Sequence, residues 1–285
     1  MSTLKIAVQK SGRLNEDSIR LLKNCGIHID NGIDQLKATA SNFPMDVLYL
    51  RNGDIPQYVE DGVADIAIVG ENLLVETGND IEIVRHLGFS KCKLSLAVPK
   101  DTDYSGPQFF EGKKIATSYP NTVKQYMEKV GVNTEIHVIK GSVEIAPNIG
   151  LADGICDLVS SGSTLFKNGL VEKDIILKSE AVLVKNKNLS KEQEELLSTI
   201  LFRIDAVQKG QKSKYVLMNA PNDRVKDIIK ILPGMKSPTV VPLATEGWSS
   251  VHTVMEEDKF WEVIDQLKTA GAEGLLIVPI EKMVL

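Results

Sequence analysis

The sequence predicts an α/β protein with two similar lobes and a smaller C-terminal domain of the ferredoxin-like type. Apolar strands that end in glycine-containing loops and lead into helices are typical of α/β sheets. Two short sequence pairs recur in the same order, which indicates two related lobes. The last part of the chain shows the order strand, helix, strand, strand, helix, strand, which is the ferredoxin-like arrangement.

The first lobe is predicted to span residues 1–90. Its first strand, residues 4–8, leads through a polar loop into a helix over residues 14–25. Lys10 and Arg13 therefore stand at the carboxyl end of a strand, where open α/β sheets bind ligands, although they could equally be solvated loop ends. The other expected elements are strands at 36–40, 45–50 and 66–69, a helix that starts at 55–60, and a helix after Gly70-Glu71-Asn72.

The two recurring pairs mark corresponding strands of the two lobes. Lys5-Ile6-Ala7 opens a strand in the first half, and Lys114-Ile115-Ala116 opens one in the second. Gly62-Val63-Ala64-Asp65 precedes a strand in the first half, and Gly150-Leu151-Ala152-Asp153 does so in the second. A cleft between two such lobes is the default place for a ligand.

The second lobe is predicted to span residues 91–180. It should contain strands at 94–98 and within 131–140, and a helix over residues 122–130. Ser142 is expected to cap a helix that begins near Val143. Glu144 would stand at the start of that helix, where it either caps the free N–H groups or points toward the cleft.

Residues 150–165 have the composition of a phosphate-binding loop. An apolar strand, residues 155–159, leads into Ser160, Ser161, Gly162, Ser163 and Thr164. Hydroxyls and backbone N–H groups at the start of a helix favour an anion, and the unexpected carboxylate of Asp157 could accept hydrogen bonds from a sugar diol. The alternatives are an ordinary serine-glycine loop, a turn role for Asp153 and a lysine partner for Asp157. Neither G-x-x-x-x-G-K-[ST] nor G-x-G-x-x-G occurs in the chain.

Beyond the second lobe, residues 181–184 form a strand that is predicted to return to the first lobe. A charged helix follows over residues 190–209, so residues 181–210 are assigned to the first lobe. Residues 208–214, rich in Lys and Gln, are the best candidate for a linker. The C-terminal domain, residues 211–285, is expected to contain strands at 215–218, 239–243, 251–255 and 275–280, and helices at 223–232 and 258–270.

Composition excludes several classes of protein. The net charge of −5 argues against a nucleic-acid-binding protein. The three cysteines lack C-x-x-C spacing, which argues against a disulfide framework or a zinc site and favours the reducing cytoplasm. We expect neither a signal peptide nor a membrane span, because no apolar run is long enough. The four histidines are isolated from one another, and each is expected to be structural.

Several segments taken together resemble the long form of ATP phosphoribosyltransferase, which performs the first committed step of histidine biosynthesis. The resemblance covers nearly the whole chain in order. The segments that carry it are QKSGRL, IPQYVEDGVADIAIVGEN, SLA after Lys93, IATSYP, GSVEIAPNIGLADGICDLVSSGSTL, SKYVLMNAP, LPGMKSPTVVPLA and LIVPIEKM.

The resemblance implies a two-lobed core like that of periplasmic binding proteins, with a C-terminal regulatory domain. The donor, 5-phosphoribosyl diphosphate, would bind to the second lobe, with its ribose hydroxyls at Asp153 and Asp157. In an extended strand these residues would be ~13 Å apart, so Gly154 is expected to bend the chain. The implied donor-binding residues are Glu144, Asp153, Gly154, Asp157, Ser160, Ser161, Gly162, Ser163 and Thr164.

ATP would lie against the first lobe, and Lys93 and Tyr119 could reach its phosphates or the diphosphate of the donor. The implied nucleotide-binding residues are Lys10, Gly12, Arg13, Glu71, Asn72, Arg85, Lys93 and Tyr119. N1 of adenine would attack the anomeric carbon, and diphosphate would leave with Mg²⁺, which is held mainly by the diphosphate. Because N1 is already a nucleophile, no general base is needed, and Asp153, Asp157, Lys10 and Arg13 would act by positioning.

The resemblance also implies regulation. Histidine would bind between C-terminal domains at Asn219, Thr239 and Gly274, and inhibit a homo-hexamer in equilibrium with a dimer. The alternative is a non-catalytic receptor for a small molecule, built on the same two lobes. A third possibility is a transferase for a free nucleobase.

Overall fold

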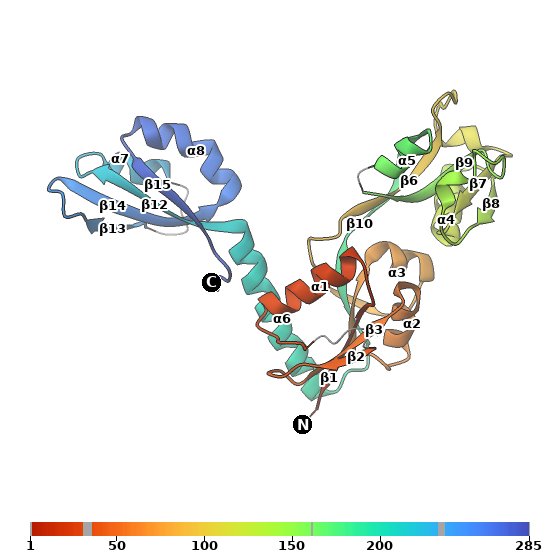
Figure 1. Ribbon diagram of the computed structural model, residues 1–285, viewed down its shortest axis with the longest axis horizontal. Helices are drawn as coiled ribbons and strands as arrows, with labels where there is room; N and C mark the ends of the chain where they lie inside the picture. Colours follow the sequence, from red (N-terminus) through yellow and green to blue (C-terminus); the bar gives the residue numbers. More distant parts are fainter. Residues whose placement is uncertain (1, 31–35, 161, 233–236, 285) are drawn as a thin grey trace. The chain divides into compact units, whose positions relative to one another are not determined.

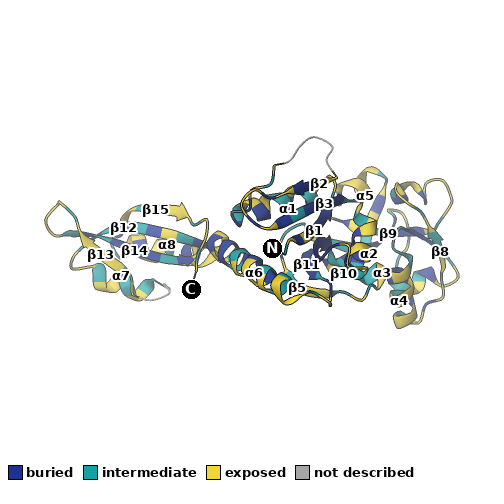
Figure 2. Ribbon diagram, turned by 90° about the horizontal axis from the view of Figure 1, so that it is seen from below, coloured by how far each residue is buried: buried dark blue, intermediate teal, exposed yellow. Residues whose placement is uncertain are grey.

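Three β-sheets organise the described residues, and each sheet has a buried core in its strands and the helices packed on them (Figures 1 and 2). The computed structural model describes residues 2–30, 36–160, 162–232 and 237–284. One compact unit comprises residues 1–23 and 27–196, and the other comprises residues 24–26 and 197–285. The first unit contains two sheets, which we call the first and second lobes, and the second unit contains the third sheet.

The first lobe is built on a six-stranded mixed sheet with the order β2-β3-β1-β4-β11-β5. Its central strands are almost continuously apolar because both faces of the sheet are covered. β11 pairs antiparallel with β4, so residues 181–184 lie in the same sheet as the strands of the first lobe. The elements are β1 Leu4–Gln9, α1 Arg13–Asn24, β2 Lys37–Thr39, β3 Met45–Leu50, η1 Asn52–Asp54, α2 Ile55–Glu60, β4 Ile66–Gly70, α3 Glu71–Thr77, β5 Glu82–His86 and β11 Ala181–Lys185.

The second lobe is built on a five-stranded sheet with the order β10-β6-β9-β7-β8. Its main core is formed around Phe110, which is fully buried among residues of β6, β7 and α4. The elements are β6 Cys92–Pro99, η2 Pro107–Phe110, β7 Lys114–Thr117, α4 Pro120–Val130, β8 Glu135–Val138, η3 Val143–Ile145, β9 Gly154–Val159, α5 Ser163–Lys167 and β10 Leu170–Ser179.

The strand β10 is not predicted from the sequence, although it is the longest strand of the second lobe. It carries four charged residues between Glu172 and Lys178, so its sequence resembles a polar surface segment. It pairs antiparallel with β6, and these two strands bring the chain into and out of the second lobe. The chain enters from β5 through residues 87–91 and returns to β11 through Glu180.

The recurring K-I-A and G-x-A-D segments form the same backbone arrangement in both lobes. The Asp65 carboxylate accepts a hydrogen bond from the Lys5 N–H at 2.6 Å, and the Asp65 N–H donates to the Lys5 carbonyl at 2.9 Å. Asp153 makes the same two contacts with Lys114, both at 2.9 Å. We call each pair an aspartate clamp. The clamps join the starts of neighbouring parallel strands, which explains why the two pairs recur together.

The predicted linker at residues 208–214 is wrong. The helix α6, Lys191–Lys212, is continuous through this stretch, and β12 begins at Ser213. Lys and Gln are good helix formers, so a composition typical of linkers is also compatible with the last turns of a helix. No described helix has both the length and the apolar character needed to cross a membrane.

The third sheet is antiparallel with the order β13-β14-β12-β15, and its helices α7 and α8 pack on a core that includes Val216, Met218 and Phe260. The sequential order β12, α7, β13, β14, α8, β15 confirms the predicted ferredoxin-like domain. The elements are β12 Ser213–Pro221, α7 Val225–Ile231, β13 Thr239–Pro242, β14 Trp248–Glu256, α8 Glu257–Thr269 and β15 Glu273–Pro279.

Candidate active site

A small cavity of about 170 Å³ lies at the carboxyl end of β9. Its polar lining residues are Glu144, Asp157, Ser160, Gly162, Ser163 and Thr164, all of which were expected from the sequence. Gly162 has a φ of 74°, a conformation that glycine adopts without strain, and it turns the chain into α5. Because α5 has five residues, hydroxyls and backbone N–H groups are better placed than a helix dipole to attract an anion. Ser161 lies outside the described residues.

Asp157 and Glu144 place two carboxyl groups in this cavity. Burial raises the pKa of Asp157, a hydrogen bond from the Leu158 N–H at 2.8 Å lowers it, and the nearby charge of Glu144 raises it again. Among the described residues, Asp157 has no ion pair, so the lysine partner considered above is not found.

The expected cap at Ser142 is wrong, because Ser142 makes no side-chain cap and the element after it is a single 3-10 turn. Glu144 lines the cavity.

Asp153 and Gly154 stand at the opposite end of β9 from this cavity. The Asp153 carboxylate accepts a hydrogen bond from the Lys114 N–H in the second clamp, a contact that joins two neighbouring strands and not the two ends of a turn. Gly154 lies in the extended strand and does not bend the chain. A Cβ at Gly154 would lie 2.7 Å from the ring of Phe110, so this glycine permits close packing. The structure therefore separates Asp153 from Asp157.

A second cavity, of about 330 Å³, lies on the first-lobe side of the loop after β9. It contains Arg13 and Asn72, which were expected, and Gln9 and Lys91, which were not. The complete lining is Gln9, Arg13, Leu14, Asn52, Gly70, Asn72, Ser90, Lys91, Cys92, Leu158 and Ser160. Lys10, Gly12 and Arg85 line none of the three cavities described in this section.

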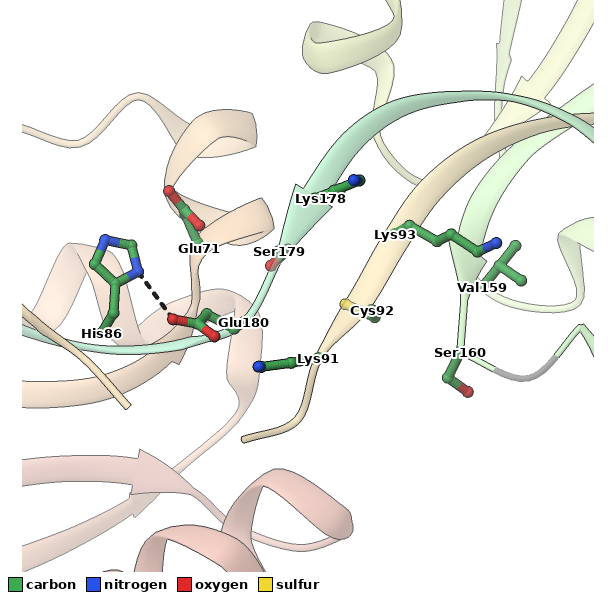
Figure 3. Close-up of a pocket in the computed structure, with 10 residues that line it drawn as sticks. All are labelled: Glu71, His86, Lys91, Cys92, Lys93, Val159, Ser160, Lys178, Ser179 and Glu180. Carbon is green, nitrogen blue, oxygen red and sulfur yellow. Dashed lines mark ion pairs between the residues drawn. The ribbon is translucent and has the colours of Figure 1, made fainter. Parts of the chain in front are cut away.

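A third cavity, of about 500 Å³, is lined by β6, β10, the start of α3 and the end of β9 (Figure 3). It gathers three lysines, Lys91, Lys93 and Lys178, which suit a polyphosphate. The side chain of Lys93 is held at 2.7 Å by Glu172, which also accepts a hydrogen bond from Ser95 at 2.8 Å. Glu71 and Lys93 were expected here. Lys178 was missed because its strand was missed, and Lys91 was missed because it follows no recognisable motif.

Ser160 lines all three cavities, so the loop after β9 connects them. Lys91 and Cys92 line both of the other two cavities. The residues from the first lobe and the hydroxyl loop of the second lobe thus line adjoining cavities that share Ser160. Adjoining cavities of this kind have room for two ligands side by side.

Tyr119 joins the two lobes beside this site. The Asn72 side-chain amide donates to the Tyr119 hydroxyl at 3.3 Å, and the Ser179 hydroxyl donates to Asn72 Oδ1 at 2.9 Å. Burial, reinforced by the negative charge of Asp157, raises the pKa of Tyr119 to about 12. The phenol is therefore protonated at neutral pH and can donate a hydrogen bond.

Comparison with known proteins identifies the family. A profile described as ATP phosphoribosyltransferase matches residues 51–206, and one described as HisG, C-terminal domain, matches residues 210–282. The chain is 58% identical over 282 residues to ATP phosphoribosyltransferase from Phocaeicola vulgatus, covering 99% of this chain and 100% of the relative. It is 54% identical over 285 residues to that of Cytophaga hutchinsonii, covering 100% of both. The chain belongs to the ATP phosphoribosyltransferase family.

A solved structure of the ATP phosphoribosyl transferase (HisG:HisZ) complex from Thermotoga maritima is 30% identical, with a TM-score of 0.62, covering 71% of this chain and 96% of that chain. The match and the sheet orders confirm the predicted α/β fold class, a two-lobed core followed by a ferredoxin-like C-terminal domain that matches the HisG, C-terminal domain profile. The chain is a pentosyltransferase of histidine biosynthesis, and the reaction of its family transfers a phosphoribosyl group to ATP.

The C-terminal residues expected from the family resemblance lie on connected positions of the third sheet. Asn219 on β12 pairs with Ser250 on β14, and a Cβ at Gly274 would lie 3.4 Å from the Asn219 side-chain amide. Thr239 on β13 pairs with His252, whose ring nitrogen lies 2.9 Å from the Ser250 hydroxyl. Asn219, Ser250, Thr239 and His252 are thus cross-strand neighbours on one face of the sheet, and Gly274 lies beside Asn219.

Proposed function

We propose that 5-phosphoribosyl diphosphate binds in the cavity at the end of β9, with its 5′-phosphate at Ser160, Gly162, Ser163 and Thr164. Asp157 and Glu144 would accept hydrogen bonds from the ribose hydroxyls. The proposal is supported most directly by Ser160, which lines this cavity and both cavities on the first-lobe side. A donor held there presents its anomeric carbon to a nucleotide bound by the first lobe.

We propose that ATP binds against Gln9, Arg13 and Asn72 of the first lobe. The three lysines of the cavity of about 500 Å³ are placed to receive phosphate groups of the nucleotide and the diphosphate of the donor. Glu71, which lines the same cavity, stays in the proposed site. Lys10, Gly12 and Arg85 are left out of it, because they line none of the three cavities.

The transfer needs positioning more than proton chemistry. N1 of adenine supplies the electron pair for the new bond to the anomeric carbon, and diphosphate leaves with the electrons of the broken bond. Asp157 and Glu144 place negative charge beside the donor, where positive charge develops on the ribose ring. Lys93 and Lys178 offset the charge of the leaving diphosphate, and holding both substrates in line accounts for the remaining acceleration.

Magnesium fits this site as a partner of the substrates. Among the described residues, no group of three or more His, Cys, Asp and Glu side chains could hold a metal ion. Mg²⁺ usually keeps several waters and binds one or two carboxylates together with substrate phosphates. We therefore propose that Mg²⁺ is carried by the diphosphate, where it neutralises the leaving group.

The Asp157→Ala variant tests the donor site. We expect Mg²⁺-dependent and ATP-dependent release of diphosphate to fall by at least ~100-fold, because the ribose loses its acceptor and a charge that favours the transition state. Asp153→Ala is the matched control, since its carboxylate binds only the backbone of Lys114, and its turnover should stay within about twofold at a temperature where the protein is folded.

Unchanged turnover in Asp157→Ala would contradict the proposed donor site. Two further measurements test the alternatives, a receptor and a transferase for another base: calorimetry of donor binding, and replacement of ATP by a free nucleobase. A receptor without catalysis would bind the donor but release no diphosphate, and a transferase for another base would accept a free nucleobase in place of ATP.

We further propose that histidine inhibits the enzyme at Asn219, Thr239 and Gly274, and that the protein forms a hexamer in equilibrium with a dimer in the cytoplasm. The closeness of these positions on neighbouring strands and the ferredoxin-like fold of their domain support an effector site. All three cysteines are unpaired, which suits a reducing compartment. Light scattering with and without histidine tests the assembly.

A further inference from the structure

Glu76 connects the two lobes beside the candidate active site. It lies in the last turn of α3 in the first lobe and is half-buried. Its carboxylate accepts hydrogen bonds from the N–H of Asn121 at 3.0 Å and from the N–H and the hydroxyl of Thr122 at 2.9 and 2.8 Å. Its backbone carbonyl accepts a further bond from the Asn121 side chain at 3.0 Å. We call these four bonds the Glu76 latch.

The latch replaces a helix cap that the second lobe lacks. Asn121 and Thr122 belong to the first turn of α4, whose N–H groups have no partner inside the helix. The residue at the cap position, Tyr119, makes no side-chain cap. A carboxylate is the preferred partner for such N–H groups, and this one comes from the other lobe.

The helix α3 therefore contacts the start of α4 at two points. Asn72, in the first turn of α3, holds the Tyr119 hydroxyl, and Glu76, in its last turn, holds Asn121 and Thr122. Two separated contacts between the same two segments restrict their distance and their relative orientation more than one contact would. The chain itself joins the lobes elsewhere, through residues 87–91 and Glu180.

We propose that Glu76 is a positioning residue for phosphoribosyl transfer, which holds the lobes at the separation at which donor and nucleotide can react. The inference rests on the proposed function, because it requires the two substrates to bind to opposite lobes. Glu76 lines none of the three active-site cavities, so its effect is on alignment and not on binding of either substrate. A misplacement of about 1 Å can reduce turnover by ~100-fold.

The test compares Glu76→Ala and Glu76→Gln with the wild type in the full-length protein. Alanine removes all three carboxylate bonds, whereas glutamine has one acceptor oxygen and keeps only part of them. We expect kcat to fall at least ~10-fold in Glu76→Ala and by a smaller factor in Glu76→Gln, while KM for each substrate changes less than about threefold. Glu128→Gln is the matched control, since Glu128 lies on α4 and its side chain pairs, within the part of the chain that the structure describes, only with exposed Lys124.

Hydrogen exchange gives a readout that does not depend on activity. The Asn121 and Thr122 amides should exchange faster in Glu76→Ala, while the central amides of β6 and β9 keep wild-type protection. A lower melting temperature with unchanged kcat would mean that Glu76 is only a helix cap, and would overturn the proposal. A rise in KM without a fall in kcat would also overturn it. If Glu76→Ala does not fold, kcat of Glu76→Gln tests the proposal: a fall supports it, and an unchanged kcat overturns it. A wild-type protein without diphosphate release would instead refute the proposed function.

Discussion

Two aspartates of β9 and its flanking turn show how position separates structural from functional carboxylates. Asp153 satisfies the backbone of a neighbouring strand, whereas Asp157 stands in a cavity with a second carboxyl group, Glu144. The sequence marks both as acidic residues beside an apolar strand. Their separation could not be predicted, because it depends on which end of the strand meets the hydroxyl loop.

The raised pKa of Asp157 predicts a conflict between stability and function. The protonated carboxyl of Asp157 is tolerated in the folded protein better than the ionised form is. The stability that this contributes is fully present below the pKa of the unfolded chain, near 4, and is lost as the pH rises through the higher pKa of the folded protein. We expect Asp157→Asn to melt at the same or a higher temperature than the wild type at pH 7, with the difference disappearing below about pH 4. Thermal unfolding between pH 3.5 and 8 measures this. A lower melting temperature at pH 7 would contradict it.

Tyr119 is expected to act as a hydrogen-bond donor throughout the ordinary pH range. Because its pKa is raised to about 12, the proton is retained below that value and is lost only as the pH rises through it. We expect Tyr119→Phe to lower kcat by roughly 10-fold, with a pH profile parallel to the wild type between pH 7 and 10. Tyr126→Phe is the control on the same helix. A deficit that disappears by pH 10 would contradict the assignment.

At the scale of elements, the strongly apolar strands were predictable, whereas the charged strand β10 was not. β1, β4 and β11 are buried on both faces, so hydrophobicity alone locates them. β10 lies at the edge of its sheet and its outer positions face solvent, so charged residues are tolerated there. Because the strand was not predicted, Lys178 was not predicted as a site residue either. The hydroxyl loop was found because its composition has a chemical meaning. The sequence around Lys91 has no recognisable motif. Lys91 lines two cavities because it lies in the segment between β5 and β6, where the chain passes from the first lobe to the second.

Gly154 is predicted to be required for packing within the second lobe. A Cβ there would approach Phe110 to 2.7 Å and the Ala97 carbonyl to 2.9 Å, so Gly154→Ala should lower the free energy of unfolding by about 1–3 kcal/mol. Gly53→Ala is the control, because a Cβ at Gly53 meets nothing within 4 Å. Denaturant unfolding measures both. Equal stability of the two variants would show that Phe110 moves aside without cost.

At the scale of the whole molecule, the chain joins a two-lobed catalytic unit to a ferredoxin-like domain through a continuous helix, α6. The order of elements in the C-terminal domain was predictable because its strands and helices are short and clearly separated by turn residues. The helical connection between the two units could not be predicted, because the Lys and Gln residues that suggest a linker also favour a helix. The proposed regulation by histidine belongs to this scale.

The effector proposal predicts that regulation can be removed without loss of catalysis. Asn219→Ala in the full-length protein should weaken inhibition by histidine at least ~10-fold, because a polar contact to the effector is lost, while kcat without histidine stays within about twofold. Asp223→Ala, an exposed change in the same domain, serves as the control. Inhibition curves at fixed substrate concentrations measure both. Unaltered inhibition in Asn219→Ala would place the effector elsewhere.

The two aspartate clamps show that both lobes use the same local framework at the start of a strand, although their sheets differ in strand number and order. After the first clamp the strand leads to Gly70, Glu71 and Asn72, and after the second it leads to the serine-rich turn at Ser160. In the proposed function, the first of these ends faces a purine nucleotide and the second a sugar phosphate, while the clamps stay the same. Ligand preference in such a core can be altered by exchanging a terminal loop and leaving the clamps intact.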